Sequence, residues 1–95
     1  MASVDTGEIR VGRKRVMSYV LATVIQFNDP NIKKVSIKAR GAAISRAVDV
    51  ALITCNRFLK DRVKVSGVKI GSDIVGEPGK ERRVSTIEII LERIE

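Results

Sequence analysis

The chain of 95 residues has no histidine, no tryptophan and only one cysteine. Without histidine, the commonest general base at neutral pH is missing, and zinc sites built from cysteine and histidine are excluded. The single cysteine, Cys55, excludes an internal disulfide. The acidic residues are scattered, and no glycine-rich phosphate loop occurs. The sequence therefore predicts a protein without catalytic residues, a cofactor, a metal or a small-molecule substrate.

Long apolar segments are also missing. No run approaches the roughly 18 residues that a membrane-spanning helix needs. The beginning of the chain, MASVDTGEIR, lacks the basic and apolar regions of a secretory signal. We therefore expect a cytoplasmic protein that has no membrane partner.

Basic residues are abundant and unevenly placed. The formal net charge is +7, with 18 Lys and Arg against 11 Asp and Glu. Between Ile9 and Val48, nine basic residues face one acid, Asp29, which gives +8, whereas the rest of the chain carries nine basic and ten acidic residues. A charge excess confined to one half of a chain is typical of a surface that binds a polyanion.

The periodicity of apolar residues predicts four strands and two helices in one small domain, 8–95, after a flexible N-terminus, 1–7. We expect strands at 8–12, 32–38, 63–74 and 84–94, and helices at 16–27 and 42–59. This β-α-β-α-β-β order predicts an α+β two-layer sandwich, in which a four-stranded mixed sheet carries both helices on one face. Residues 76–82 (GEPGKER) would close a long basic β-hairpin.

Three details refine this expectation. The alternation of apolar residues slips by one position at Ser66-Gly67, which predicts a β-bulge. Cys55 lies in the apolar stripe of the second helix, which favours a core position over a reactive thiol. Ile90 and Ile94 lie on the other face of the last strand from its main apolar set, which would make that face a subunit contact.

The two junctions between a strand and the following helix are the most informative segments. Gly12-Arg13-Lys14-Arg15 precedes the first helix, and Lys38-Ala39-Arg40-Gly41 precedes the second. Neither junction offers a Ser, Thr, Asp or Asn cap, so backbone N–H groups stay free for phosphate oxygens. Both junctions should fall at the same edge of the sheet and form one cationic surface. Solvated turn charges are the alternative explanation.

The hairpin supplies a second set of cations, Lys80, Arg82 and Arg83, on an arm that could reach into a groove. Basic β-arms in the minor groove respond to groove width and potential more than to base identity. The basic segments lack the aromatic platforms on which single strands stack. The pattern therefore favours binding to the backbone of double-stranded nucleic acid with little sequence preference.

Four stretches, VGRKRVMSYVLA, IKARGAAISRAVD, NRFL and RVSTIEI, resemble in order and spacing the Alba family of archaeal chromatin proteins. The resemblance extends from Ile9 to Ile94. It implies a fold similar to the C-terminal domain of translation initiation factor 3. It also implies a dimer that binds double-stranded DNA, and often RNA, with its body on the duplex backbone and its two arms at neighbouring minor grooves.

By position, the resemblance places DNA contacts at both junctions and on the arm. Phe58 matches an aromatic used in dimer–dimer contacts along DNA, although its pattern fits a core position equally well. The expected nucleic-acid contacts, from the resemblance and from the charge pattern together, are Arg13, Lys14, Arg15, Lys38, Arg40, Gly41, Arg46, Lys80, Arg82 and Arg83.

The chain also departs from the family pattern. Arg13-Lys14-Arg15 stands where members often have Lys-Lys-Pro, so a lysine whose acetylation is proposed to weaken DNA binding is replaced by Arg13. Lys14 is then the remaining candidate for modification. Ala42 stands where a basic residue often follows the glycine. These departures indicate a divergent paralogue.

The leading hypothesis is a homodimeric chromatin protein of the chromosome (nucleoid) that coats, compacts or bridges double-stranded DNA. The alternative is an RNA-binding protein, such as a ribonucleoprotein subunit or an RNA chaperone, because phosphate recognition does not distinguish the sugars. A third hypothesis is a protein scaffold with an acidic partner. A heterodimer with a paralogue also stays open.

Overall fold

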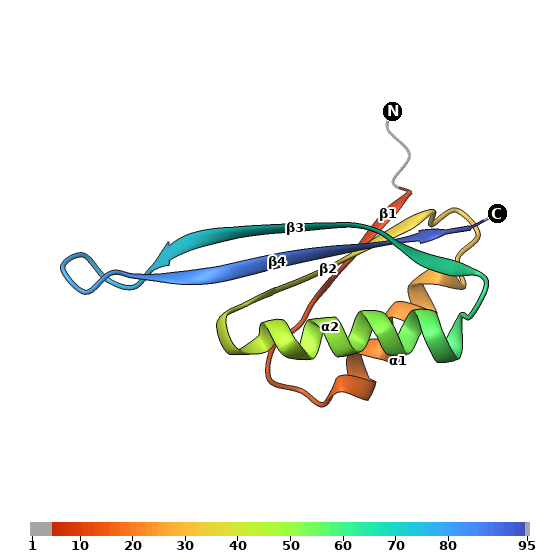
Figure 1. Ribbon diagram of the computed structural model, residues 1–95, viewed down its shortest axis with the longest axis horizontal. Helices are drawn as coiled ribbons and strands as arrows, with labels where there is room; N and C mark the ends of the chain where they lie inside the picture. The colour runs from red at the N-terminus through yellow and green to blue at the C-terminus, as the bar shows by residue number, and fades with distance from the viewer. Residues whose placement is uncertain (1–4, 95) are drawn as a thin grey trace.

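The computed structural model describes residues 5–94. Figure 1 shows a twisted sheet with both helices on one of its faces. The elements are β1 (Thr6–Arg10), α1 (Val16–Phe27), β2 (Lys34–Arg40), a 3₁₀ turn η1 (Gly41–Ala43), α2 (Ile44–Ile53), a π-helical turn η2 (Thr54–Phe58), β3 (Val63–Val75) and β4 (Arg82–Arg93). The strand order is β1-β2-β4-β3, with β1 parallel to β2 and β4 antiparallel to both neighbours. The predicted α+β fold is confirmed.

The core lies between the sheet and the helices and is mainly aliphatic. The register pairs Val35 with Leu91 and Ile37 with Ile89, so these side chains point to the same side of the sheet, and all four are buried. Cys55 joins this core, and its burial raises the pKa of the thiol. The prediction that Cys55 is a core residue is therefore confirmed.

The first helix has the bounds that the sequence predicted, Val16–Phe27. The second helical segment runs from Gly41 to Phe58, close to the predicted 42–59, but only its middle, Ile44–Ile53, is α-helical. The N–H of Leu59 donates to the carbonyl oxygen of Thr54 at 2.8 Å, and this bond across five residues widens the last turn. Within residues 5–94, no helix is long and apolar enough to cross a membrane.

The first two strands are shifted relative to the prediction. Thr6 and Gly7, which the sequence assigned to a flexible end, pair with the start of β2, whereas residues 1–4 lie outside the described part of the chain. The N–H of Ile32 donates to the carbonyl oxygen of Asp29 at 3.0 Å, which keeps Ile32 in the preceding turn. β2 therefore starts and ends two residues later than expected, at Lys34 and Arg40 respectively.

β3 and β4 form a hairpin that is longer than the body of the sheet. Val65 pairs with Leu91 and Gly67 with Ile90, so the register slips at Ser66 and the predicted bulge is confirmed. Pairing of β2 with β4 stops at Arg40 and Thr86, but β3 and β4 stay paired to Val75 and Arg82. The outer part, residues 72–85, therefore projects from the body, as Figure 1 shows, and we call it the arm.

Arg93 fastens the end of β4 to the connection between α1 and β2. Its guanidinium donates hydrogen bonds to the carbonyl oxygens of Phe27 at 2.8 Å and Ile32 at 2.7 Å. The same group lies 5.6 Å from the centroid of the Phe27 ring. A cation at the C-terminal end of α1 also complements the helix dipole.

Candidate nucleic-acid interface

One groove gathers arginines from three segments that are far apart in the sequence. Its lining includes Arg13 from the β1–α1 junction, Arg40 and Arg46 from the β2–α2 junction, and Arg82 from the base of the arm. Within residues 5–94, no acidic residue lines it. We call this feature the arginine groove. The two junctions thus meet at one edge of the sheet, as the topology predicted, and the arm joins them.

Tyr19 holds the first junction in place. Its phenol oxygen accepts hydrogen bonds from the backbone N–H groups of Gly12, at 2.9 Å, and Lys14, at 3.0 Å. α1 begins without a side-chain cap and without an acidic residue in its first turn, so the N–H groups of Val16 and Met17 have no side-chain acceptor, whereas that of Ser18 donates to the carbonyl oxygen of Arg15 at 3.0 Å. Arg13, Lys14 and Arg15 are exposed beside these groups.

Gly41 lets the chain turn directly from β2 into the second helical segment. Its φ of +59° lies in the left-handed region, where other residues are strained, and an added Cβ would lie 3.3 Å from Cγ1 of Val84. Neither η1 nor α2 has a side-chain cap or an acidic residue in its first turn. The helix start beside Arg40 is therefore favourable for an anion.

Arg46 connects the two junctions. Its Nη1 donates a hydrogen bond to the carbonyl oxygen of Gly12, which lies 34 positions earlier in the chain. Because a guanidinium carries several N–H donors in one plane, this bond leaves other donors for a ligand in the groove. Arg46 therefore both sets the distance between the junctions and contributes charge to the arginine groove.

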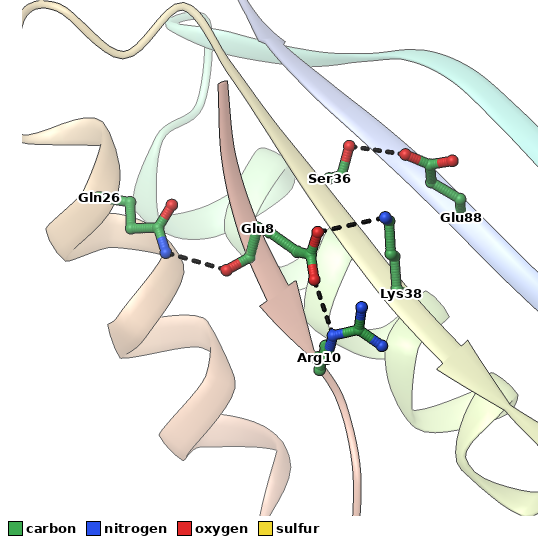
Figure 2. Close-up of polar contacts among 6 residues, drawn as sticks. All are labelled: Glu8, Arg10, Gln26, Ser36, Lys38 and Glu88. Carbon is green, nitrogen blue, oxygen red and sulfur yellow. Dashed lines mark hydrogen bonds and ion pairs between the residues drawn. The ribbon is translucent and has the colours of Figure 1, made fainter. Parts of the chain in front are cut away.

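The other predicted contacts lie outside the lining of the groove. Lys14 and Arg15 are exposed next to Arg13, and Lys80 and Arg83 are exposed on the arm. Lys38 is different, because its side chain lies on the open face of the sheet, the face that carries no helix. There its ammonium group pairs with the Glu8 carboxylate (Figure 2), and Nζ lies 3.1 Å from Oε1.

Two residues that shape this region were missed by the sequence analysis, Tyr19 and Glu8. The available signal for Tyr19 was a hydroxyl in the first turn of a helix, next to a loop whose N–H groups needed partners. The signal for Glu8 was its place two positions before Arg10 in a strand, which puts both side chains on one face. The hydrogen bond from Lys38, with the charges of Arg10 and Lys38, lowers the pKa of Glu8.

Phe58 lies at the end of η2 with 44% of its surface exposed, so it is available for contact with another molecule. No group of three or more His, Cys, Asp or Glu side chains that could hold a metal ion occurs between residues 5 and 94. The fold and the groove together define a class: a small two-layer α+β protein that presents a cationic groove and a projecting arm with three basic residues, Lys80, Arg82 and Arg83.

Comparison with known proteins identifies the family. The family model described as Alba matches residues 7–72. The DNA/RNA-binding protein Alba of Methanococcus maripaludis is 54% identical over 84 residues, which cover 87% of this chain and 93% of that protein. The protein of the same name from Pyrobaculum calidifontis is 51% identical over 85 residues, which cover 88% of this chain and 91% of that protein.

Solved structures agree with this result. The structure of Alba from Thermoplasma volcanium has a TM-score of 0.84 and 45% identity, and the match covers 92% of this chain and 100% of that one. ALBA1 from Trypanosoma brucei has a TM-score of 0.72 and 28% identity, and the match covers 94% of this chain and 70% of that one. The chain belongs to the Alba family, as its four sequence stretches predicted. This family is non-enzymatic, so the protein is not an enzyme.

Proposed function

We propose that this protein is a chromatin protein of the nucleoid that binds double-stranded DNA as a homodimer and coats, compacts or bridges it. The arginine groove is the observation that carries this proposal, because four arginines line it and, within residues 5–94, no acidic residue does. Arginine binds phosphate oxygens in a bidentate geometry, and the uncapped helix starts beside the groove add N–H donors. The relatives named DNA/RNA-binding protein Alba support the same ligand class.

The proposed contacts explain why binding would depend little on sequence. Arginines and helix N–H groups in the groove meet phosphates, which carry no base information. Arg82, Arg83 and Lys80 on the arm would enter the minor groove, whose pattern of donors and acceptors is degenerate. The arm is narrow and projects beyond the sheet (Figure 1), so it can reach a groove while the body stays on the backbone.

An apolar strip along β3 supports the proposed homodimer, and it lies on the helix side of the sheet, not on the face of Ile90 that the sequence suggested. Val65 and Val68 pair with the buried Leu91 and Ile89, so they point to the helix side of the sheet. They are nevertheless 40% and 55% exposed, because β3 is an edge strand and α2 lies over β2 and β4. An exposed edge strand is a template for pairing with another chain, and a contiguous exposed apolar patch marks an interaction site. Leu52 on α2 is also exposed on this side.

Light scattering tests the dimer. Val68→Glu places a charge on the strip and should convert the protein to a monomer. Ile25→Glu makes the same change at an exposed apolar residue of α1 and serves as the matched control. Equal masses for the two variants would contradict the assignment of the strip.

A salt titration of binding to a DNA duplex tests the function. If a dimer neutralises about six phosphates, log K should fall with log salt at a slope of about −5. Replacing Arg13, Lys14 and Arg40 by alanine should make the slope clearly shallower, by about 0.9 for each lost contact. Binding that does not depend on salt would refute the proposal.

The matched control removes the same charge elsewhere. Lys33, Lys34 and Lys60 are exposed and lie at the other end of the sheet from the arginine groove. Replacing these three lysines by alanine should leave the slope close to that of the unchanged protein. If both triple variants lose affinity and slope equally, the net charge rather than the groove controls binding.

RNA is the second candidate ligand, because the relatives are named for binding both nucleic acids. The groove and the helix starts would meet the phosphates of either duplex. Crosslinking in cells, followed by sequencing of the bound nucleic acid, distinguishes a chromatin protein from a ribonucleoprotein subunit or RNA chaperone. Recovery of mainly structured RNA would favour the second candidate.

Three finer assignments belong to the same proposal. Phe58 would join neighbouring dimers along DNA, and its exposure at the end of η2 supports this role. Lys14, exposed beside the arginine groove, is the candidate for a modification that weakens binding. The β3 strip would also accept a paralogue of similar shape, so co-expression with a paralogue and mass measurement would detect a heterodimer.

A further inference from the structure

The open face of the sheet carries an ion-paired cluster beside the arginine groove. Each oxygen of the Glu8 carboxylate binds a different cation (Figure 2): Oε2 lies 2.7 Å from Nε of Arg10, and Oε1 lies 3.1 Å from Nζ of Lys38. The backbone oxygen of Glu8 accepts a hydrogen bond from Nε2 of Gln26 on α1 at 3.1 Å. The position of Glu8 is therefore fixed from the helix side as well as from the open face.

Arg10 and Lys38 would otherwise extend the cationic surface. Lys38 lies two positions before Arg40 in β2, which is about 7 Å along a strand and on the same face. A second concavity is lined by four basic residues, Arg10, Lys38, Arg40 and Lys69, and by two acidic ones, Asp73 and Glu88. Arg40 also lines the arginine groove. The two concavities therefore meet at Arg40. The cations next to a polyanion bound in the arginine groove would be Arg10 and Lys38, and both are paired with Glu8.

Glu8 contributes little to folding by itself. Exposed ion pairs add at most a small amount to stability, because they lose side-chain freedom and are screened by salt. Glu8, Arg10 and Lys38 are all at least partly exposed to solvent. Removing the carboxylate should therefore leave the fold intact, so any change that follows can be read in binding.

We propose that Glu8 is a specificity-determining residue that confines nucleic acid to the arginine groove and the arm. Its ion pairs with Arg10 and Lys38 make these two cations unavailable to phosphates. This inference rests on the proposed function. A phosphate that approached the open face would meet the Glu8 carboxylate and would have to displace it from both cations. The binding surface therefore ends at the ion-paired cluster of Glu8, Arg10 and Lys38. Lys38 is then not a phosphate contact in the unaltered protein.

The fixed state of Glu8 is consistent with its chemistry. The hydrogen bond from Lys38 is the largest cause that holds the pKa of Glu8 below its usual range, and the charges of Arg10 and Lys38 act in the same direction. The group that faces Lys38 from β4 is Glu88, which accepts a hydrogen bond from Ser36 at 2.8 Å. Glu8 is therefore ionised, and its two partners are held, at neutral pH.

The test is a gain of binding. Glu8→Gln keeps the size of the side chain but removes its charge, so Arg10 and Lys38 become free for phosphates. For each chain that contacts a duplex, the salt slope should steepen by up to about 1.8, since each new contact adds about 0.9. Between 50 and 200 mM salt, this corresponds to an additional fall in affinity of about tenfold.

Glu92→Gln is the matched control. Glu92 also lies on the open face, opposite Lys34 and Lys64 at the far end of the sheet from Arg40, and it makes no ion pair within residues 5–94. Glu92→Gln removes the same charge as Glu8→Gln, but the salt slope of this variant should equal that of the unaltered protein. The combined variant Glu8→Gln, Arg10→Gln, Lys38→Gln should return to the unaltered slope.

The outcomes separate this inference from the function on which it rests. A steeper slope for Glu8→Gln alone supports the boundary role of Glu8. Equal slopes for Glu8→Gln and Glu92→Gln overturn it, because net charge would then explain both. A shallower slope when Arg10 and Lys38 are replaced while Glu8 is present also overturns it, because these two cations would then contact phosphates in the unaltered protein. Failure of the unaltered protein to bind a duplex at low salt would instead overturn the proposed function.

Discussion

Removing the hydroxyl of Tyr19 tests how the binding loop is held. In Tyr19→Phe the ring stays in place, but the N–H groups of Gly12 and Lys14 lose their common acceptor. Lys14 is exposed, so water replaces its partner at almost no cost, whereas Gly12 is half-buried. An unsatisfied, partly buried donor costs about 1–2 kcal/mol, so we expect the free energy of unfolding to fall by about that amount.

Urea unfolding followed by circular dichroism measures this loss. Tyr19 is the only tyrosine and the chain has no tryptophan, so fluorescence cannot follow the variant. The protein concentration must be held constant, because association of subunits would add to stability. Each kcal/mol should lower the melting temperature by about 4–8 °C in a domain of this size. The slope of the unfolding free energy against urea concentration should not change, since the surface buried on folding stays the same.

Tyr19→Phe also distinguishes the effect of loop positioning on DNA binding from the effect of the number of cations. All cations remain, so the salt slope should stay constant while the affinity for DNA falls by about tenfold, as expected if about 1.4 kcal/mol of ordering must be supplied on binding. Thr23→Val is the control, because the hydroxyl of Thr23 is buried in the same helix and donates only to the carbonyl oxygen of Tyr19, at 2.8 Å. Unchanged stability and affinity in Tyr19→Phe would refute the reasoning.

Three further predictions follow from the packing, the backbone and the ion pair. Ile37→Ala removes most of a fully buried side chain and should destabilise the protein by about 2–5 kcal/mol in urea unfolding. Gly41→Ala forces a side chain into the left-handed region and should cost about 1–2 kcal/mol in the same assay. The lowered pKa of Glu8 means that its pairing with Lys38 stabilises the fold above the ordinary carboxyl pKa and is lost as pH falls through the lowered value. Because this ion pair is exposed, melting curves of the unaltered protein and Glu8→Gln should differ only slightly at neutral pH, and the difference should vanish in acid.

Much of the fold was predictable because its signals are local. The 3.6-residue periodicity from Val16 to Phe27 is uninterrupted, so the bounds of α1 followed directly from the sequence. The one-residue slip at Ser66 likewise located the bulge, because a strand exposes alternate residues to one face. The π-helical end of the second segment was not predictable, because an apolar stripe fixes which residues face the core but not how tightly the last turn is wound.

The sequence by itself determined the order of elements, the aliphatic core and the two cationic junctions with uncapped helix starts. These properties depend on composition and on neighbours a few positions apart. Only the tertiary structure decided which cations act together. It brought Arg13, Arg40, Arg46 and Arg82 into one groove, and it paired Lys38 with Glu8, which lies 30 positions earlier in the chain. Such pairings depend on the register between strands and on the path of the loops, and charge periodicity carries no information about either.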